Sequence, residues 1–184
     1  MYQEFQQKAE AFQFIFCRYS APLSVSFEGQ TERVNAELVS GNFFHALGVG
    51  PATGRVLSPE EDDRVYKGHP MVVLSHDYWV NRFGADRAVI GKKMLVNNYA
   101  MTIAGVSAAG FHGLDPARSP QIRLPIQMKP LMTPGWDDLG ERRSRWVQMF
   151  GRIEAGPHRG VREGLARAVV PAALALRGDS PGFQ

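Results

Sequence analysis

The stretch from Ser40 to Gly48 constrains the fold most, because it predicts a short apolar helix with a signal at each end. Ser40 or Asn42 is suited to cap the start, since short polar side chains accept hydrogen bonds from the unpaired amides of a first turn. Gly48 is suited to the left-handed conformation that ends many helices. The apolar face of this helix is formed by Phe43, Phe44 and Leu47. No nucleophile, metal cluster or phosphate loop accompanies it, so it indicates packing or docking, not catalysis.

Alternating apolar and polar residues predict strands on both sides of this helix. Before it we expect a helix over 2–12, strands over 14–16 and 23–27, and a hairpin partner over 34–39. After it we expect a buried strand over 71–74, then a helix capped by Ser75 and ended by Gly84. Further on, the sequence predicts a hairpin of 91–96 and 99–106, short strands over 122–126 and 145–153, and a last helix over 161–168. This mixture indicates an α+β fold.

Size and composition bound the class of protein. The chain has 184 residues, of which 44% are hydrophobic and 21% charged, as in ordinary folded domains. Its net charge of +3 is scattered, so the sequence gives no basic face for nucleic acid. Cys17 is the single cysteine, which excludes an intrachain disulfide and a zinc site built from cysteines. No apolar run approaches the roughly 20 residues that a membrane helix needs, and the N-terminus lacks the pattern of a signal peptide.

Acidic and basic runs have simpler explanations than a ligand site. Residues 58–63 combine a capping serine, a proline and four carboxylates, which is typical of a solvated helix start. The alternating oxygen ligands and central glycine of a calcium loop are absent from this run. Arg142, Arg143 and Arg145 form the one basic cluster, for which surface ion pairs are expected, with contact to anionic lipid or an acidic partner as the functional alternative.

A histidine–aspartate pair and a set of methionines are two further candidates for functional sites. His76 and Asp77 have the residue types of a base and its orienting carboxylate, but neighbours on a helix point in different directions and no nucleophile elbow is present. Dispersed methionines suit either an adaptable substrate groove or the core, and we favour the core for most of Met94, Met101, Met128, Met132 and Met149. Cys17 is expected to be a small buried hydrophobic residue. We therefore expect no catalytic, cofactor-binding or metal-binding residues in this chain, and no cofactor.

An ordered series of short blocks extends from residue 40 to residue 152. Each block is a weak motif, whereas their order and spacing are specific. The blocks are Ser40–Phe44, Gly54–Arg55, Val72–Ser75 with Trp79, Arg82–Gly84, Ile90–Lys92, Leu95–Asn97, Ile103–Val106, Gly110–Gly113 and Arg143–Arg152. Together they resemble the MacB-like periplasmic core domain, which is the extracytoplasmic domain of FtsX-like ABC transporter permeases. The resemblance covers most of residues 1 to about 156. Two departures are Arg123, which replaces a usual aromatic residue, and the segment 157–160, which departs from the family's helix entry.

The resemblance implies a two-lobed extracytoplasmic domain with mixed sheets. Residues 1–38 and 142–184 would form an incomplete membrane-proximal lobe of βαβ type, and residues 39–141 an inserted α/β lobe. It also implies a non-catalytic domain, periplasmic in location, that couples ATP-driven motion of membrane helices to substrate export or mechanotransmission. The implied partners are the transmembrane part of the same permease, a cytoplasmic nucleotide-binding domain acting indirectly and a possible periplasmic protein. The full-length protein would be a homodimer.

Two alternatives come from other classes of function. One is an extracytoplasmic module that binds a peptide or a lipid-like ligand through residues 108–135, which are rich in proline and contain methionine. The other is a hydrolase that uses His76 or His112. The chain has no phosphate-binding loop of the Gly-x-x-x-x-Gly-Lys-Ser/Thr type, so ATP would have to bind elsewhere.

Overall fold

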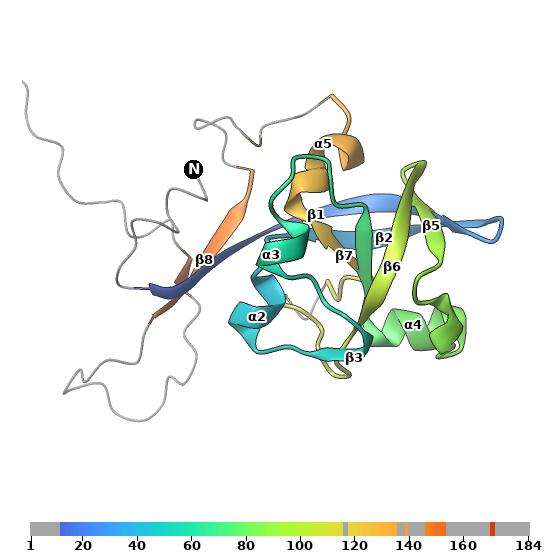
Figure 1. Ribbon diagram of the computed structural model, residues 1–184, viewed down its shortest axis with the longest axis horizontal. Helices are drawn as coiled ribbons and strands as arrows, with labels where there is room; N and C mark the ends of the chain where they lie inside the picture. The colour runs from blue at the N-terminus through green and yellow to red at the C-terminus, as the bar shows by residue number, and fades with distance from the viewer. Residues whose placement is uncertain (1–11, 116–117, 136–138, 140–145, 154–169, 172–184) are drawn as a thin grey trace, which may run out of the picture.

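The computed structural model describes residues 12–115, 118–135, 139, 146–153 and 170–171. Its strands are β1 (Phe12–Phe27), β2 (Gln30–Val39), β3 (Pro51–Gly54), β4 (Met71–Leu74), β5 (Lys93–Val96), β6 (Tyr99–Ser107), β7 (Ile122–Pro125), β8 (Gln148–Ile153) and β9 (Val170–Pro171). Its helices are α2 (Phe43–Leu47), α3 (Pro59–Asp62), α4 (His76–Phe83) and α5 (Lys129–Met132), with 3₁₀ turns η1 (Arg87–Val89) and η2 (Ile126–Met128). This mixed α/β chain is dominated by one sheet (Figure 1).

Strands β1 and β2 form a long antiparallel hairpin, closed by Glu28 and Gly29 with positive φ angles of 49° and 81°. The prediction of two separate strands over 14–16 and 23–27 is wrong, because β1 runs without a break for 16 residues. Pro22 is tolerated because β1 has a neighbour on only one side there: pairing with β8 stops at Arg18 and pairing with β5 starts at Val25. Of the helix predicted over 2–12, Phe12 begins β1 instead, and the rest lies outside the described residues.

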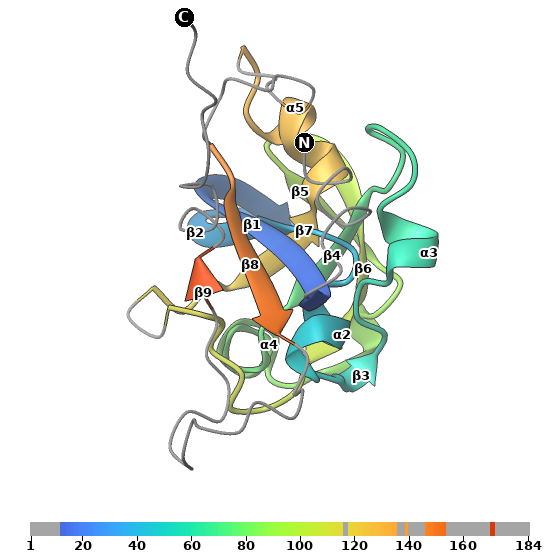
Figure 2. The same cartoon turned by 90° about the vertical axis from the view of Figure 1, so that its left-hand side faces the viewer.

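The pairings close into a ring of strands in the order β1, β2, β7, β4, β6, β5 and back to β1. Alternate residues of these strands point inward and form the larger core, which includes Leu23, Leu38, Leu74, Ile103 and Leu124. Helix α4 packs Tyr78 and Trp79 against this core, and η2 and α5 add Met128 and Met132. Figures 1 and 2 place α4 and α5 at opposite ends of the ring. Both ends of the core are therefore covered by helices.

A second core lies outside the ring, where α2 packs on β1, β2 and β4. Phe43 and Phe44 are fully buried there, and the ring of Phe16 packs edge-on against Phe43. Gly48 ends α2 in the left-handed conformation, as predicted. The prediction that Ser40 or Asn42 caps the first turn is wrong, because no side chain caps α2.

The polar residues before α2 instead fasten the helix to β1. The Cys17 amide donates to Ser40 Oγ at 3.0 Å, and Asn42 Nδ2 donates to the Ile15 carbonyl at 2.8 Å. The Ser40 hydroxyl also donates to Asn42 Oδ1 at 2.8 Å. The bonds to Cys17 and Ile15 join residues more than 20 positions apart, so a local capping rule does not reveal them.

The centre of the chain follows its local signals. Ser75 Oγ accepts a hydrogen bond from the Tyr78 amide at the start of α4, and Gly84 ends that helix with φ 60°. Asn97 and Asn98, with φ of 47° and 67°, form the tight turn between β5 and β6. The predictions of strands β4 and β7, helix α4 and this hairpin are confirmed. Strand β3, which pairs with β6, was not predicted.

The first half of β1 and its partner β8 extend away from the ring (Figure 1). β1 thus pairs with β8 over 12–18 and with β2 and β5 further along, so strands from both predicted lobes belong to one sheet. The division at residues 38 and 141 stays a prediction. The helix predicted over 161–168 and the cluster Arg142, Arg143 and Arg145 lie outside the described residues.

Candidate functional site

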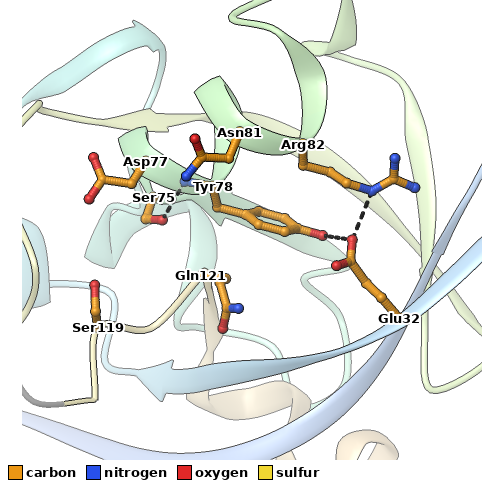
Figure 3. A pocket seen from close by; sticks show the side chains of 8 residues that line it. All are labelled: Glu32, Ser75, Asp77, Tyr78, Asn81, Arg82, Ser119 and Gln121. Carbon is orange, nitrogen blue, oxygen red and sulfur yellow. Dashed lines mark hydrogen bonds and ion pairs between the residues drawn. The ribbon is translucent and has the colours of Figure 1, made fainter.

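A polar pocket with a volume of about 290 Å³ lies between α4, the start of β2 and the segment before β7 (Figure 3). Its lining residues are all polar or aromatic. They are Glu32, Ser75, Asp77, Tyr78, Asn81, Arg82, Ser119 and Gln121. Asp77 and the segment 108–135 are candidates from the sequence, whereas nothing in the local sequence indicates that Glu32 of β2 and Arg82 of α4 meet beside them.

Glu32 fixes one end of this pocket. Its Oε1 accepts hydrogen bonds from Tyr78 Oη at 2.7 Å and from Arg82 Nε at 2.8 Å. Burial, followed by the hydrogen bond to Glu32, raises the pKa of Tyr78, so the phenol keeps its proton. Tyr78 therefore acts as a donor that holds the carboxylate in place.

Asp77 fixes the other end and brings two histidines together. Its carboxylate oxygens lie 3.8 Å from His76 Nδ1 and 3.4 Å from His112 Nδ1. The 3.8 Å between His76 and Asp77 is too long for a hydrogen bond, so Asp77 does not orient His76 as the carboxylate of a catalytic pair would. Ser75 lines the same pocket, but its Oγ is hydrogen-bonded to the Tyr78 amide as the cap of α4. Within the described residues no group of three or more His, Cys, Asp or Glu side chains is placed to hold a metal ion.

A network of buried charges lies on the outer face of β1, β2 and β7. Arg18 Nη1 donates to Glu37 Oε1 at 2.7 Å, and Arg123 Nε donates to Glu37 Oε2 at 3.0 Å. Glu37 and Arg123 have no exposed surface, and Arg18 is 7% exposed. Glu37 and Arg123 meet because of the register between β2 and the parallel strand β7, in which these two residues pair directly. From the sequence, Arg123 stands out only as a departure from the family pattern, and the burial and pairing of Arg18 and Glu37 were not predicted.

Arg123 lies among aromatic rings although it is a charged residue. Its guanidinium carbon is 4.7 Å from the ring centre of Phe111 and 5.9 Å from that of Phe43. Burial is the largest influence on the pKa of Arg123 and lowers it, while Glu37 raises it. Among the residues that the structure describes, neither Nη1 nor Nη2 of Arg123 has a hydrogen-bond partner.

The acidic run before β4 begins α3 as predicted, with Glu60 and Glu61 exposed, but its last two carboxylates hold the fold together. Ser58 caps α3 as predicted, but Asp62 is 1% exposed and accepts two hydrogen bonds from Arg55, at 2.6 and 3.0 Å. Asp63 accepts from the Gly41 amide at 2.9 Å, and burial raises the pKa of its carboxyl group. Asp62 and Asp63 therefore tie α3 to Arg55 and to the segment that leads into α2, and for these two residues the prediction of a solvated surface is wrong.

The predicted core residues are mostly confirmed. Met94, Met101, Met128 and Met132 are each at most 1% exposed, whereas Met149 is only partly buried. Cys17 is buried, and burial strongly raises the pKa of its thiol. The predicted methionine-containing groove in 108–135 is thus not a surface feature at Met128 or Met132. In the described part of the chain, no helix is both long and apolar enough to cross a membrane.

Comparison with known proteins identifies the family. The sequence matches the model of the MacB-like periplasmic core domain over residues 3–158. The chain belongs to this family. It is therefore a periplasmic-type domain of MacB-like ABC transporter permeases, as the resemblance implied. No curated protein matches the sequence.

Solved structures show the same fold. The periplasmic region of MacB from Actinobacillus actinomycetemcomitans is similar with a TM-score of 0.63 at 16% identity, covering 83% of this chain and 63% of that one. A domain of a putative permease from Porphyromonas gingivalis gives 0.59 at 15% identity, covering 85% and 62%. The extracellular domain of the noncanonic ABC-type transporter YknZ from Gram-positive bacteria gives 0.55 at 10%, covering 70% and 62%. The chain thus spans less than two thirds of the length of these domains.

Proposed function

We propose that this domain is non-catalytic and couples ATP-driven motion of the membrane helices of its own permease to substrate export or mechanotransmission. The partners in this proposal are the transmembrane part of the same chain and, indirectly, a cytoplasmic nucleotide-binding domain. A periplasmic partner protein and a homodimeric full-length permease are further parts of the proposal. Family membership supports the setting, and the path of β1 supports the mechanical role.

The observation that carries the proposal is the continuity of β1. One strand of 16 residues pairs with β8 at its start and with β2 and β5 at its end. At about 3.3 Å per residue it extends over roughly 50 Å. Because a paired strand resists bending, a displacement at the β8 end reaches the ring without passing through a flexible linker.

The lobe boundaries are also a proposal: residues 1–38 and 142–184 in the membrane-proximal lobe, and 39–141 in the inserted lobe. The separation of β8 and the first half of β1 from the ring supports a division on this side of the molecule (Figure 1).

Two experiments test the proposal. The gene around this segment should encode one hydrophobic span upstream and three downstream, and a complete gene without them would remove the transporter assignment. In the full-length permease, replacing Tyr19 and Ser20 of β1 by glycine should lower ATP-dependent transport while ATP hydrolysis continues. The matched control places the same two glycines at Gln30 and Thr31, beside the hairpin turn, where we expect transport to be kept.

The second candidate function is capture of a peptide by the polar pocket. The observation that favours it is that Ser119 and Gln121, from the proline-rich segment, line this pocket together with two carboxylates. Its polar lining fits a peptide better than a lipid-like ligand. A thermal-shift screen separates the two candidates, because a binding module gains stability with its ligand and a pure coupling domain does not.

A further inference from the structure

The buried network on the outer face of the ring has an unbalanced charge. Arg18 and Arg123 bring two positive charges, and Glu37 brings one negative charge. Glu37 already uses both of its carboxylate oxygens, one for each arginine. Uncompensated buried charge is costly, and unsatisfied buried donors are rare in native proteins. The imbalance falls on Arg123, whose Nη1 and Nη2 have no acceptor among the described residues.

The surroundings of these two nitrogens suit a small ligand. A Cβ atom at Gly113 would lie 2.7 Å from Arg123 Nη2, so only glycine leaves space next to this nitrogen. Glu37 Oε2 and Pro120 Cδ bound the same space, each 3.6 Å from that Cβ position. Phe43 and Phe111 present aromatic rings to the same group. The guanidinium carbon lies over these rings, and guanidinium nitrogens only donate, so an anion can be accepted only in the plane of the guanidinium, at the edge formed by Nη1 and Nη2.

We propose that Arg123 Nη1 and Nη2 bind one small inorganic anion, of the size of chloride, in the plane of the guanidinium. The anion neutralises the network of Arg18, Glu37 and Arg123 and gives both nitrogens an acceptor. A small ion is required because both nitrogens are fully buried and Gly113 is in close contact. This site is independent of any transport function.

The segment that covers the site has the means to move. Phe111 is only partly buried, and glycines with positive φ, Gly110 at 76° and Gly113 at 91°, flank the pair Phe111 and His112. His112 Nδ1 contacts Asp77 at the start of α4. Entry of the anion displaces the Phe111 ring, so occupancy of the site is linked to the position of this segment.

The experiment measures the melting temperature of the chain while chloride replaces gluconate at constant ionic strength. A rise of roughly 3–6 °C is expected at about ten times the dissociation constant, and it should grow further with the logarithm of the chloride concentration. Arg123→Met and Arg123→Phe should abolish the rise; the second restores an aromatic residue at a position where the family usually has one. Arg118→Met is the matched control, since Arg118 is 70% exposed and should leave the rise unchanged.

Crystals soaked in bromide locate the ion directly by anomalous scattering. A peak within hydrogen-bonding distance of Arg123 Nη1 or Nη2 supports the proposal even if neither Arg123 variant folds. Peaks confined to the surface mean an adventitious ion only and overturn it. A wild-type chain that is indifferent to chloride, or an Arg123 variant that keeps the full rise, also overturns it.

Discussion

Removing Glu37 should destabilise the domain far more than removing Arg123, although both are completely buried and bonded to each other. Glu37→Gln keeps the size of the side chain but changes the charge of the network from +1 to +2. It also loses charge-assisted bonds of 2.7 and 3.0 Å to two arginines. Arg123→Met changes the charge to zero and leaves Glu37 paired with Arg18.

The magnitude follows from what each change leaves behind. Removing one partner of a buried ion pair costs about 3–5 kcal/mol, because the other charge stays buried without compensation. Glu37→Gln should therefore lower the free energy of unfolding by about 3–5 kcal/mol and the melting temperature by roughly 6–20 °C. Arg123→Met should change the free energy of unfolding by less than about 1.5 kcal/mol, because an apolar side chain among Phe43 and Phe111 replaces a charge.

Urea denaturation of the two variants at one fixed chloride concentration is the assay. Circular dichroism of the folded state controls for loss of structure before denaturant is added. Equal losses in the two variants would refute the reasoning, since they would mean that the network is stabilised by packing and not by charge balance. A larger loss for Arg123→Met would refute it as well.

Three further predictions follow from other contacts. Gly113→Ala should lower the free energy of unfolding, measured by urea denaturation, by about 1–3 kcal/mol, because the new Cβ would lie 2.7 Å from Arg123 Nη2 at a φ of +91°. Gly50→Ala is the control and should change the free energy of unfolding little, since no atom lies within 4 Å of its Cβ position. Burial raises the pKa of Asp63 in the folded state, so its contribution favours folding at low pH and declines as pH rises through that pKa. The free energy of unfolding of Asp63→Asn, relative to wild type, should therefore increase with pH, and a difference that stays constant with pH would contradict this. Alanine at both His76 and His112 should leave the ATPase activity and transport of the full-length permease unchanged, and loss of either with the fold intact would favour the hydrolase alternative.

Elements with complete local signals could be predicted from the sequence. Helix α4 has its capping serine and its left-handed glycine within ten residues of each other, and the turn at Asn97–Asn98 is set by two residues that tolerate positive φ. These signals act through the nearest backbone groups, so no knowledge of the rest of the chain is needed. The same holds for Gly48 at the end of α2.

Elements whose polar groups bond over long distances could not be predicted in the same way. Ser40 and Asn42 have the residue types of helix caps, yet they bond to Cys17 and Ile15 of β1. Asp62 has the residue type and position of a solvated carboxylate, yet it is 1% exposed and accepts hydrogen bonds from Arg55, seven residues before it. Whether such a side chain caps a helix, faces solvent or bonds to another segment depends on which segment packs against it in the fold. The local sequence does not encode that packing.

The buried charges lie where the ring of strands meets the pair formed by β8 and the first half of β1. Within the proposed function, this position lets them transmit a displacement. Arg18 is the residue at which β1 pairs with both β2 and β8, and its Nε donates to Gln148 of β8 at 3.0 Å. Through Glu37 the same side chain is joined to Arg123 of β7, so polar bonds connect β8, β1, β2 and β7 in sequence. Apolar contacts slide with little directional preference, whereas charge-assisted bonds hold fixed distances and angles. Under the proposed function, a displacement of β8 would therefore be passed to the ring at a defined register, held by these charge-assisted bonds.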